Sequence, residues 1–303
     1  MKVALLNGLA RVLLGGIWLL HWLPLPLLAA LGSGLGWVLF HFAGARRRVA
    51  LRNIELCFPE RNAAQRRALV REHFRWLARS LLERSLLWHA SPERLRRLIR
   101  VEGDVQLAER SWKEQQRSTL WLVPHFLGVD VAGAAVQLHQ RRPGVDIYAP
   151  QSNAVLDAAL LKGRSRLGKD EFYRRQDGAR AVVRAIKRGL AFFNPADMDF
   201  GPRDAAFVPF FGHPAATLLA PSRMARGLNM VVQPVVAEML PGGQGYVVRF
   251  LDPWDDWPTD DPAADAAAMN AFIEAQIRRC PAQYLWVHKR FKTRPPGEPY
   301  LYE

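Results

Sequence analysis

The sequence has few cysteines and lacks the short motifs that mark common hydrolytic and metal sites. Its two cysteines, Cys57 and Cys280, lie far apart and outside any C-x-x-C or His-rich spacing. This excludes a disulfide framework and a structural zinc site, and it fits a reducing compartment. No H-E-x-x-H sequence occurs, and without a G-x-S-x-G nucleophile elbow a serine α/β-hydrolase lacks its main sign.

Charged residues are missing between Arg11 and Arg46. This apolar run predicts that residues 1–45 are a membrane anchor, with room for one tilted span and an interfacial piece but not for two full spans. Arg46, Arg47 and Arg48 follow at once and place that side in the cytoplasm by the positive-inside rule. A signal peptide is the alternative. It is less favoured because its apolar region is normally shorter and no small-residue cleavage site is obvious.

The net charge of +14 is concentrated near this anchor. Residues 1–100 hold 17 Lys and Arg against 5 Asp and Glu, whereas the rest of the chain holds 25 against 23. The excess favours an anionic lipid surface or an acidic protein partner over nucleic acid, for which no module is found. A predicted helix over residues 62–89 has a basic face, which either is solvated or lies on an anionic bilayer.

Strands and helices alternate along the remainder of the chain, without repeats or low-complexity linkers. Half of the 303 residues are hydrophobic, so the chain is long and apolar enough for a sizeable core. We expect residues 46–303 to form one α/β domain with a mostly parallel or mixed central sheet flanked by helices. The expected strands include residues 120–123, 146–149, 191–193, 230–236, 246–251 and 284–287, and the expected helices include 131–138, 153–161, 180–188 and 261–279.

One stretch, residues 119–130, carries the strongest candidate chemistry. A buried strand ends at Pro124, His125 follows, and Asp130 comes five residues later. On one helix the two side chains would lie about 140° apart, so they meet only if His125 is in the turn and Asp130 in the first helical turn. A carboxylate beside an imidazole fixes its tautomer and raises its basicity. The alternative is an ordinary loop histidine and an ordinary first-turn acid.

With no serine or cysteine nucleophile marked nearby, His125 as a general base suggests direct attack by a substrate hydroxyl on a thioester. A backbone or arginine donor would stabilise the oxyanion, and no metal is needed. Residues 163–170 nearly match a phosphate-binding P-loop, but Asp170 replaces the required hydroxyl. Arg164 and Arg166 instead suit direct phosphate or carboxylate binding, or are solvated. Asp197 and Asp199 follow a strand and either face a substrate or hold their loop.

Taken together, these residues resemble a known family. The H-x-x-x-x-D spacing of His125 and Asp130 is the signature of glycerolipid-type acyltransferases, and further blocks resemble the bacterial lipid A biosynthesis late acyltransferases, the lauroyl/myristoyl acyltransferase family. Those blocks are RNIELCFPE (52–60), GRSRLG (163–168), DFGPRDAAFVPFFGHPAAT (199–217) and QYLWVHKRFKTRPPG (283–297). The family's P-D-Q-D-F-G block is altered at its first and third positions, Ala196 and Met198, so Asp199 is preferred over Asp197.

The resemblance implies a glycerolipid-acyltransferase-like α/β domain at the bacterial inner membrane, facing the cytoplasm and needing no cofactor or metal. It would move a fatty acyl chain from acyl carrier protein to the 3-hydroxyl of an acyl chain on a Kdo-bearing lipid A precursor. His125 would be the base, Asp130 its orienting acid, Arg164 a phosphate or oxyanion partner, and Asp199 a site-lining acid. The alternatives are another membrane lipid as acceptor, or a catalytically silent protein that binds lipid or carrier protein.

Overall fold

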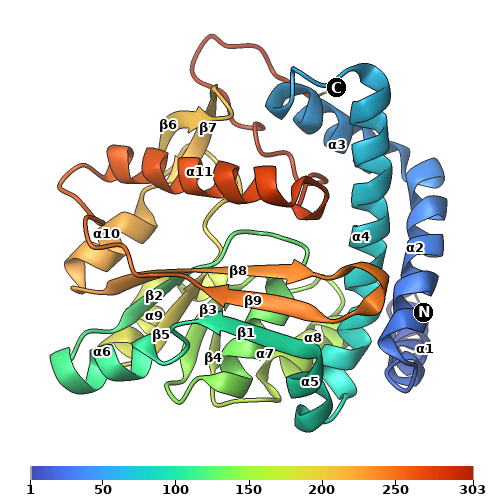
Figure 1. Ribbon diagram of the computed structural model, residues 1–303, viewed down its shortest axis with the longest axis horizontal. Coiled ribbons are helices and arrows are strands. Elements are labelled where there is room, and N and C mark those ends of the chain that lie inside the picture. The colour runs from blue at the N-terminus through green and yellow to red at the C-terminus, as the bar shows by residue number, and fades with distance from the viewer. Residues whose placement is uncertain (1, 303) are drawn as a thin grey trace.

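A seven-stranded sheet lies at the centre of the computed structural model, which describes residues 2–302 (Figure 1). Its strand order is β1-β9-β8-β2-β5-β3-β4, and every neighbouring pair is parallel except β8 and β9. This confirms the predicted mixed α/β sheet. The strands are β1 (Ile99–Gly103), β2 (Thr119–Leu122), β3 (Gly144–Tyr148), β4 (Glu171–Arg174), β5 (Ala191–Asn194), β8 (Val231–Met239) and β9 (Tyr246–Phe250).

Helices cover both faces of the sheet, and a separate antiparallel hairpin, β6 (Ala205–Phe210) with β7 (His213–Leu218), lies beside α11. In Figure 1, α11 lies on one side of the sheet and the long α4 runs along its edge. The helices are α1 (Lys2–Leu20), α2 (Leu25–Phe42), α3 (Gly44–Cys57), α4 (Ala63–His89), α5 (Pro92–Leu98), α6 (Leu107–Gln115), α7 (Val129–His139), α8 (Ala154–Ser165), α9 (Ala179–Lys187), α10 (Ala220–Gly227) and α11 (Pro262–Arg279).

Strand β2 is buried at every position, and after Thr119 it is apolar because both of its faces are covered. Leu120 and Leu122 belong to one hydrophobic cluster, and Trp121 and Val123, which follows the strand's last residue, belong to the other. Alternate side chains of a strand point to opposite faces, and a strand covered on both sides reads as a continuous apolar run. This run therefore fixes β2 in the middle of the sheet, with its carboxyl end leading to His125.

Helix termini are set by local hydrogen bonds. At the start of α4, Gln65 N donates to Asn62 Oδ1 and Asn62 N donates to Gln65 Oε1, both at 2.9 Å, a reciprocal capping box. The predicted helix over residues 62–89 is thus confirmed, but its basic face is not wholly solvated. Arg79 is 4% exposed, and its Nε donates to Glu83 at 2.7 Å.

The apolar N-terminus forms two helices where we expected one span and an interfacial piece. Val3–Leu20 and Leu25–Phe42 are each long and apolar enough to cross a membrane by length and composition. However, α2 lies against α4 along its length (Figure 1). A Cβ at Gly32 would lie 2.7 Å from Arg79 Cα and one at Gly36 would lie 2.4 Å from Arg75 Cα, so this contact requires glycine. One face of α2 is therefore a protein contact.

The predicted strand over residues 284–287 is wrong. Only an isolated bridge joins Tyr284 to Phe126, and the following residues form turns. Leu285 N donates to His125 O at 3.1 Å, and Leu127 N donates to Gln283 O at 2.7 Å. The segment is apolar because it packs under the loop after β2, not because it extends the sheet. It consequently forms part of the wall around His125.

Candidate active site

The register of two parallel strands brings His125 to Asp197. Leu122 of β2 is paired with Asn194 of β5, and Val123 N donates to Asn194 O at 3.1 Å. His125 and Asp197 each come three residues after that pair. Parallel strands end at the same edge of a sheet, which is where α/β proteins place their ligands. The two loops therefore run together past the sheet, and their side chains meet.

Asp197 holds both the backbone and the ring of His125. The backbone N of His125 donates to the two Asp197 carboxylate oxygens at 3.1 and 3.0 Å, and its Nδ1 lies 2.6 Å from Asp197 Oδ1. Asp197 is 1% exposed. Burial alone would raise the pKa of this carboxyl, but the charge and hydrogen bonds of His125, with a smaller contribution from Arg290, lower it. The carboxylate is thus ionised and accepts a hydrogen bond from His125 Nδ1–H.

This contact fixes the tautomer of His125. Because Nδ1–H donates to the carboxylate, the lone pair of a neutral ring is on Nε2. His125 lines a cavity at this end of the sheet, and within residues 2–302 its Nε2 makes no side-chain hydrogen bond. An imidazole held at Nδ1 by an acid and open at Nε2 has the arrangement of a general base.

Asp130 does not orient the imidazole, which corrects our expectation. Its carboxylate is bound by two arginines: Arg164 donates from Nε and Nη2 at 3.0 and 2.7 Å, and Arg84 Nη2 lies at 2.6 Å. Burial would raise the pKa of Asp130, but the two guanidinium groups outweigh it and hold the pKa far below its usual range. In the first turn of α7, the side chain reaches α4 and α8 rather than the loop that carries the ring. Its role at the site is to hold Arg164.

Asp146 of β3 is a third carboxyl at the site, and no pattern in the sequence singles it out. Its Oδ1 is buried without a hydrogen-bond partner among the described residues. Burial raises the pKa of Asp146 to about 7, a shift that Asp130 increases and that Arg164 and His125 oppose. The side chain is therefore poised between its neutral and charged forms near neutral pH.

The cavity that these residues line has a volume of about 890 Å³. This lies within the range of roughly 300–1,000 Å³ that is usual for small-molecule sites. Large apolar side chains form much of its wall, among them Trp88, Ile147, Phe172, Phe193 and Phe200. Of the residues selected from the sequence, His125, Asp130 and Arg164 line it, and Arg166 and Asp199 do not.

Arg166 does not line the cavity, and its guanidinium group binds backbone carbonyls at the C-terminal end of α4. Its Nη1 donates to Leu87 O at 3.0 Å and its Nη2 to Ala90 O. Free carbonyls at a helix C-terminus are satisfied by such cationic donors. Partial burial lowers the pKa of the guanidinium. The expectation that Arg166 binds substrate is therefore corrected to a structural contact.

Asp199 likewise holds its loop. It accepts hydrogen bonds from Gly201 N at 2.9 Å and from Thr293 N and Oγ1 at 2.6 and 2.7 Å. It is 4% exposed and ties the loop after β5 to the C-terminal segment. Of the two aspartates, Asp197 faces the catalytic ring and Asp199 positions the loop. The preference for Asp199 as the site-lining acid was wrong.

No serine, threonine or cysteine is among the residues that line the cavity in the described part of the chain. Burial raises the pKa of Cys57 well above its usual value and that of Cys280 to about 12, so neither is a ready thiolate. Within residues 2–302, no three His, Cys, Asp or Glu side chains gather as a metal site. The geometry suits a reaction in which a base activates a hydroxyl of the substrate itself.

Comparison with known proteins agrees with this class of enzyme. Residues 5–293 match the family described as bacterial lipid A biosynthesis acyltransferase. The chain is 34% identical to the lipid A biosynthesis lauroyltransferase of Escherichia coli (strain K12), over 95% of this chain and 93% of that protein. It is also 34% identical to the palmitoleoyltransferase of that organism, over 95% and 92%, and 30% identical to its myristoyltransferase, over 90% and 82%.

The family match and these relatives show that the protein is an acyltransferase, and its mixed α/β fold and its cavity lined by large apolar side chains fit that class. More narrowly, the chain belongs to the bacterial lipid A biosynthesis acyltransferase family.

Proposed function

We propose that this enzyme transfers a fatty acyl chain from acyl carrier protein to the hydroxyl of a 3-hydroxyacyl chain on a Kdo-bearing lipid A precursor. The observation that carries the proposal is the His125 ring, bound at Nδ1 by buried Asp197 and open at Nε2 beside a cavity that no serine, threonine or cysteine of the described residues lines. In this proposal the dyad of the reaction is His125 with Asp197.

The step balances without any further reactant. His125 Nε2 takes the proton of the acceptor hydroxyl as its oxygen attacks the thioester carbonyl, and a tetrahedral oxyanion forms. The C–S bond then breaks, the proton returns to the leaving thiolate, and the products are an ester and the carrier's free thiol. Arg164 lines the cavity and is fixed by Asp130 through Nε and Nη2, which leaves Nη1 as a donor for the oxyanion.

Charge supports an acidic carrier protein as the donor. Arg175 and Arg203 are exposed and line the cavity, and α9 beside them has exposed Arg180, Arg184 and Lys187. A basic rim around an active-site entrance steers an acidic partner toward it and raises its association rate.

Exposed apolar side chains support a membrane location. On α1, α2 and the turn between them, Val12 is 75% exposed, Trp22 67% and Phe42 82%. Large apolar residues in such number at the surface mark an interaction with lipid or protein. With Arg46–Arg48 directly after α2, we place the domain at the cytoplasmic face of the inner membrane.

The test is an acyl-transfer assay with full-length protein in detergent, using acyl carrier protein thioesters and a Kdo-bearing lipid A precursor. We expect His125→Ala to lower kcat by roughly 10²–10⁴-fold, the usual contribution of a general base. His41→Ala, an exposed histidine on α2, is the matched control and should keep wild-type activity. Full activity of His125→Ala with an unchanged thermal unfolding midpoint would refute the mechanism.

Mass spectrometry of lipid A from cells lacking the protein then identifies the acceptor. Loss of one secondary acyl chain supports the proposal. An unchanged acylation pattern, with transfer to a phospholipid or glycolipid in the assay, would assign a different membrane lipid. No transfer to any lipid would indicate a catalytically silent binding protein.

A further inference from the structure

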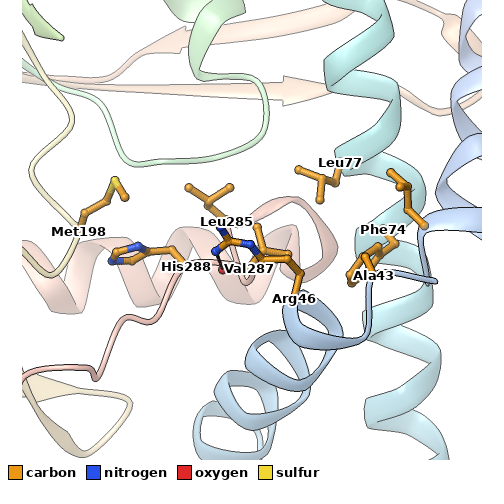
Figure 2. A pocket seen from close by; sticks show the side chains of 9 residues that line it. Ala43, Arg46, Phe74, Leu77, Met198, Leu285, Val287 and His288 are labelled. Atoms are coloured by element: carbon orange, nitrogen blue, oxygen red, sulfur yellow. Dashed lines mark hydrogen bonds between the residues drawn. The ribbon is translucent and has the colours of Figure 1, made fainter. Parts of the chain in front are cut away.

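A second hollow adjoins the catalytic cavity on the side of the N-terminal helices. It has a volume of about 410 Å³, and we call it the α2–α4 groove because Leu39 of α2 and Phe74 and Leu77 of α4 form its apolar wall. Met198 and Leu285 line both this groove and the catalytic cavity. Figure 2 shows Met198 and His288 on one side of the groove and the α4 side chains on the other. Two separate apolar sites therefore share one wall.

The shared wall lies at the catalytic base. Leu285 N donates to the backbone O of His125 at 3.1 Å, and His125 lines the larger cavity. An acyl transfer between two lipid-bearing substrates needs two chains held so that the hydroxyl of one meets the thioester of the other. The larger cavity has His125 in its wall, and the α2–α4 groove, which shares Met198 and Leu285 with it, offers a separate place for the second chain.

Charge and exposure at the groove fit an anionic lipid. Arg46 of α3 is exposed, and its side chain makes a single long hydrogen bond within residues 2–302, from Nη1 to Val287 O at 3.3 Å (Figure 2). Arg47, in contrast, is committed to the last turn of α2, where its Nη1 donates to Phe40 O at 2.6 Å. Arg46 is thus the guanidinium at this groove that remains available for phosphate or carboxylate.

The groove lies beside exposed apolar side chains of α2, and its wall contains a neutral polar side chain. Leu35, Val38 and Phe42 on the outer side of α2 are 37%, 40% and 82% exposed, and the same helix supplies Leu39 to the groove. His288 Nε2 accepts a hydrogen bond from Asp199 N at 3.0 Å. The proton of its neutral ring is therefore on Nδ1, as a donor for an ester or hydroxyl oxygen.

We propose that the α2–α4 groove binds an acyl chain of the lipid acceptor, and that Arg46 binds an anionic group of its headgroup. The proposal rests on the proposed function, since it assigns the second substrate of the same reaction to this groove. The donor chain then occupies the larger cavity, and the acceptor hydroxyl reaches His125 across Met198 and Leu285.

The first experiment fills the groove. Leu77→Trp enlarges a side chain of its wall, and Leu81→Trp, one turn further along α4 at a 42% exposed position, is the matched control. We expect Leu77→Trp to raise KM for the lipid A precursor about tenfold, as an overfilled site no longer admits a chain. KM for the carrier thioester and its slow hydrolysis by water should change less than twofold, and Leu81→Trp should match the wild type. A rise in the donor KM instead would place the donor chain in the groove and overturn the proposal, as would no change in either KM.

The second experiment tests the charge. Arg46→Ala should raise KM for the precursor about fivefold with little effect on kcat, and Arg46→Lys should restore part of the loss, because a lysine keeps the charge but not the two-pronged geometry. Arg48→Ala, also exposed on α3, should behave as the wild type. Equal losses for Arg46→Ala and Arg48→Ala would indicate general surface charge and overturn the specific site.

A binding measurement separates failure of this proposal from failure of the proposed function. Wild type, Leu77→Trp and Leu81→Trp are compared by native mass spectrometry with lipid A precursor and with phosphatidylglycerol as probes. If the wild type transfers no acyl chain, the proposed function fails. The groove assignment still holds if Leu77→Trp selectively loses the precursor. Equal loss of both lipids would make the groove a general phospholipid site and overturn it.

Discussion

The loop after β5 and the first turn of α7 each bring an aspartate to the candidate site, but the two carboxylates have different partners. Asp197, in the loop, faces an imidazole and a backbone N–H of His125. Asp130, at the helix, faces two guanidinium groups, from Arg84 and Arg164. A carboxylate that accepts a hydrogen bond from a neutral imidazole can raise the basicity of that ring. A carboxylate bound by two permanent cations can only position those cations.

This difference assigns distinct tasks to residues that are close in space. In the proposed mechanism, Asp197 controls the protonation of His125, and Asp130 controls where Arg164 places its remaining donor. Asp146, which lacks a partner for Oδ1, belongs to neither arrangement. The following changes test that division, beginning with the largest expected effect.

Asp197→Asn should lower kcat by roughly 10³–10⁴-fold, because an amide in place of the carboxylate favours the wrong imidazole tautomer. The acceptor KM should change little, since Asp197 is 1% exposed and does not line the cavity. Steady-state kinetics with both substrates measure this. If Asp130→Asn lowered kcat by the same factor and Asp197→Asn did not, the assignment of the two carboxylates would be reversed.

Asp130→Asn should act mainly on stability. The change removes the carboxylate that both Arg84 and Arg164 bind, and the side chains of these arginines are 28% and 29% exposed. Breaking a well-buried ion pair lowers the free energy of unfolding by about 3–5 kcal/mol. Asp260→Asn is the control, because Asp260 is 87% exposed and its pair with Arg226 should contribute below about 1 kcal/mol. Denaturant unfolding in detergent gives both values. Equal, small losses would show that the arginines do not depend on Asp130.

Much of the fold could be predicted from local patterns. The apolar run of β2, the helix over residues 62–89 and the helix that starts at Asp261-Pro262 each depend on neighbours in the sequence, and all three are confirmed. His125 was also placed correctly in the turn after β2, because a strand that ends at a proline and precedes a helix leaves few other conformations.

The partner of His125 could not be predicted in this way. It depends on the pairing of Leu122 with Asn194, 72 residues apart, and on the equal length of the two segments that follow. The five-residue spacing to Asp130 suggested a contact, but the two arginines that bind Asp130 come from α4 and α8. Because Ala196 and Met198 alter the family block, Asp199 was preferred over Asp197, although the position of Asp197 in that block is intact. The packing of α2 against α4 could not be predicted locally either, since the Gly32 and Gly36 contacts join segments far apart in the sequence.

Gly36→Ala tests whether the contact of Arg84 and Arg164 with Asp130 depends on the packing of α2 against α4. A Cβ there would lie 2.5 Å from Phe74 O, so α4, which carries Arg84, must shift; the expected loss is about 1–3 kcal/mol of stability. Gly34→Ala is the control. A Cβ at Gly34 meets nothing within 4 Å, and alanine should stabilise the helix by up to about 1 kcal/mol. Precursor-independent hydrolysis of the donor should persist in both variants, since the His125–Asp197 contact lies apart from this interface. Unfolding midpoints that are equal for the two variants would contradict a tight α2–α4 contact.

Asp146→Asn gives the smallest expected effect, and it is a pH effect. The pKa of Asp146 is raised to about 7 in the folded chain, against an unfolded value of about 3.9. Between these values the folded state binds more protons than the unfolded state, so this group makes stability fall as pH rises from about 4 to 7. Asparagine does not titrate and removes that fall. The stability of Asp146→Asn relative to the wild type should therefore increase by about 1–2 kcal/mol between pH 4.5 and pH 8, the full shift being reduced by residual solvent access. Unfolding curves at the two pH values measure the change. A difference that stays constant with pH would mean that Arg164 keeps Asp146 ionised throughout, and that this third carboxyl belongs with the arginine-bound side of the site.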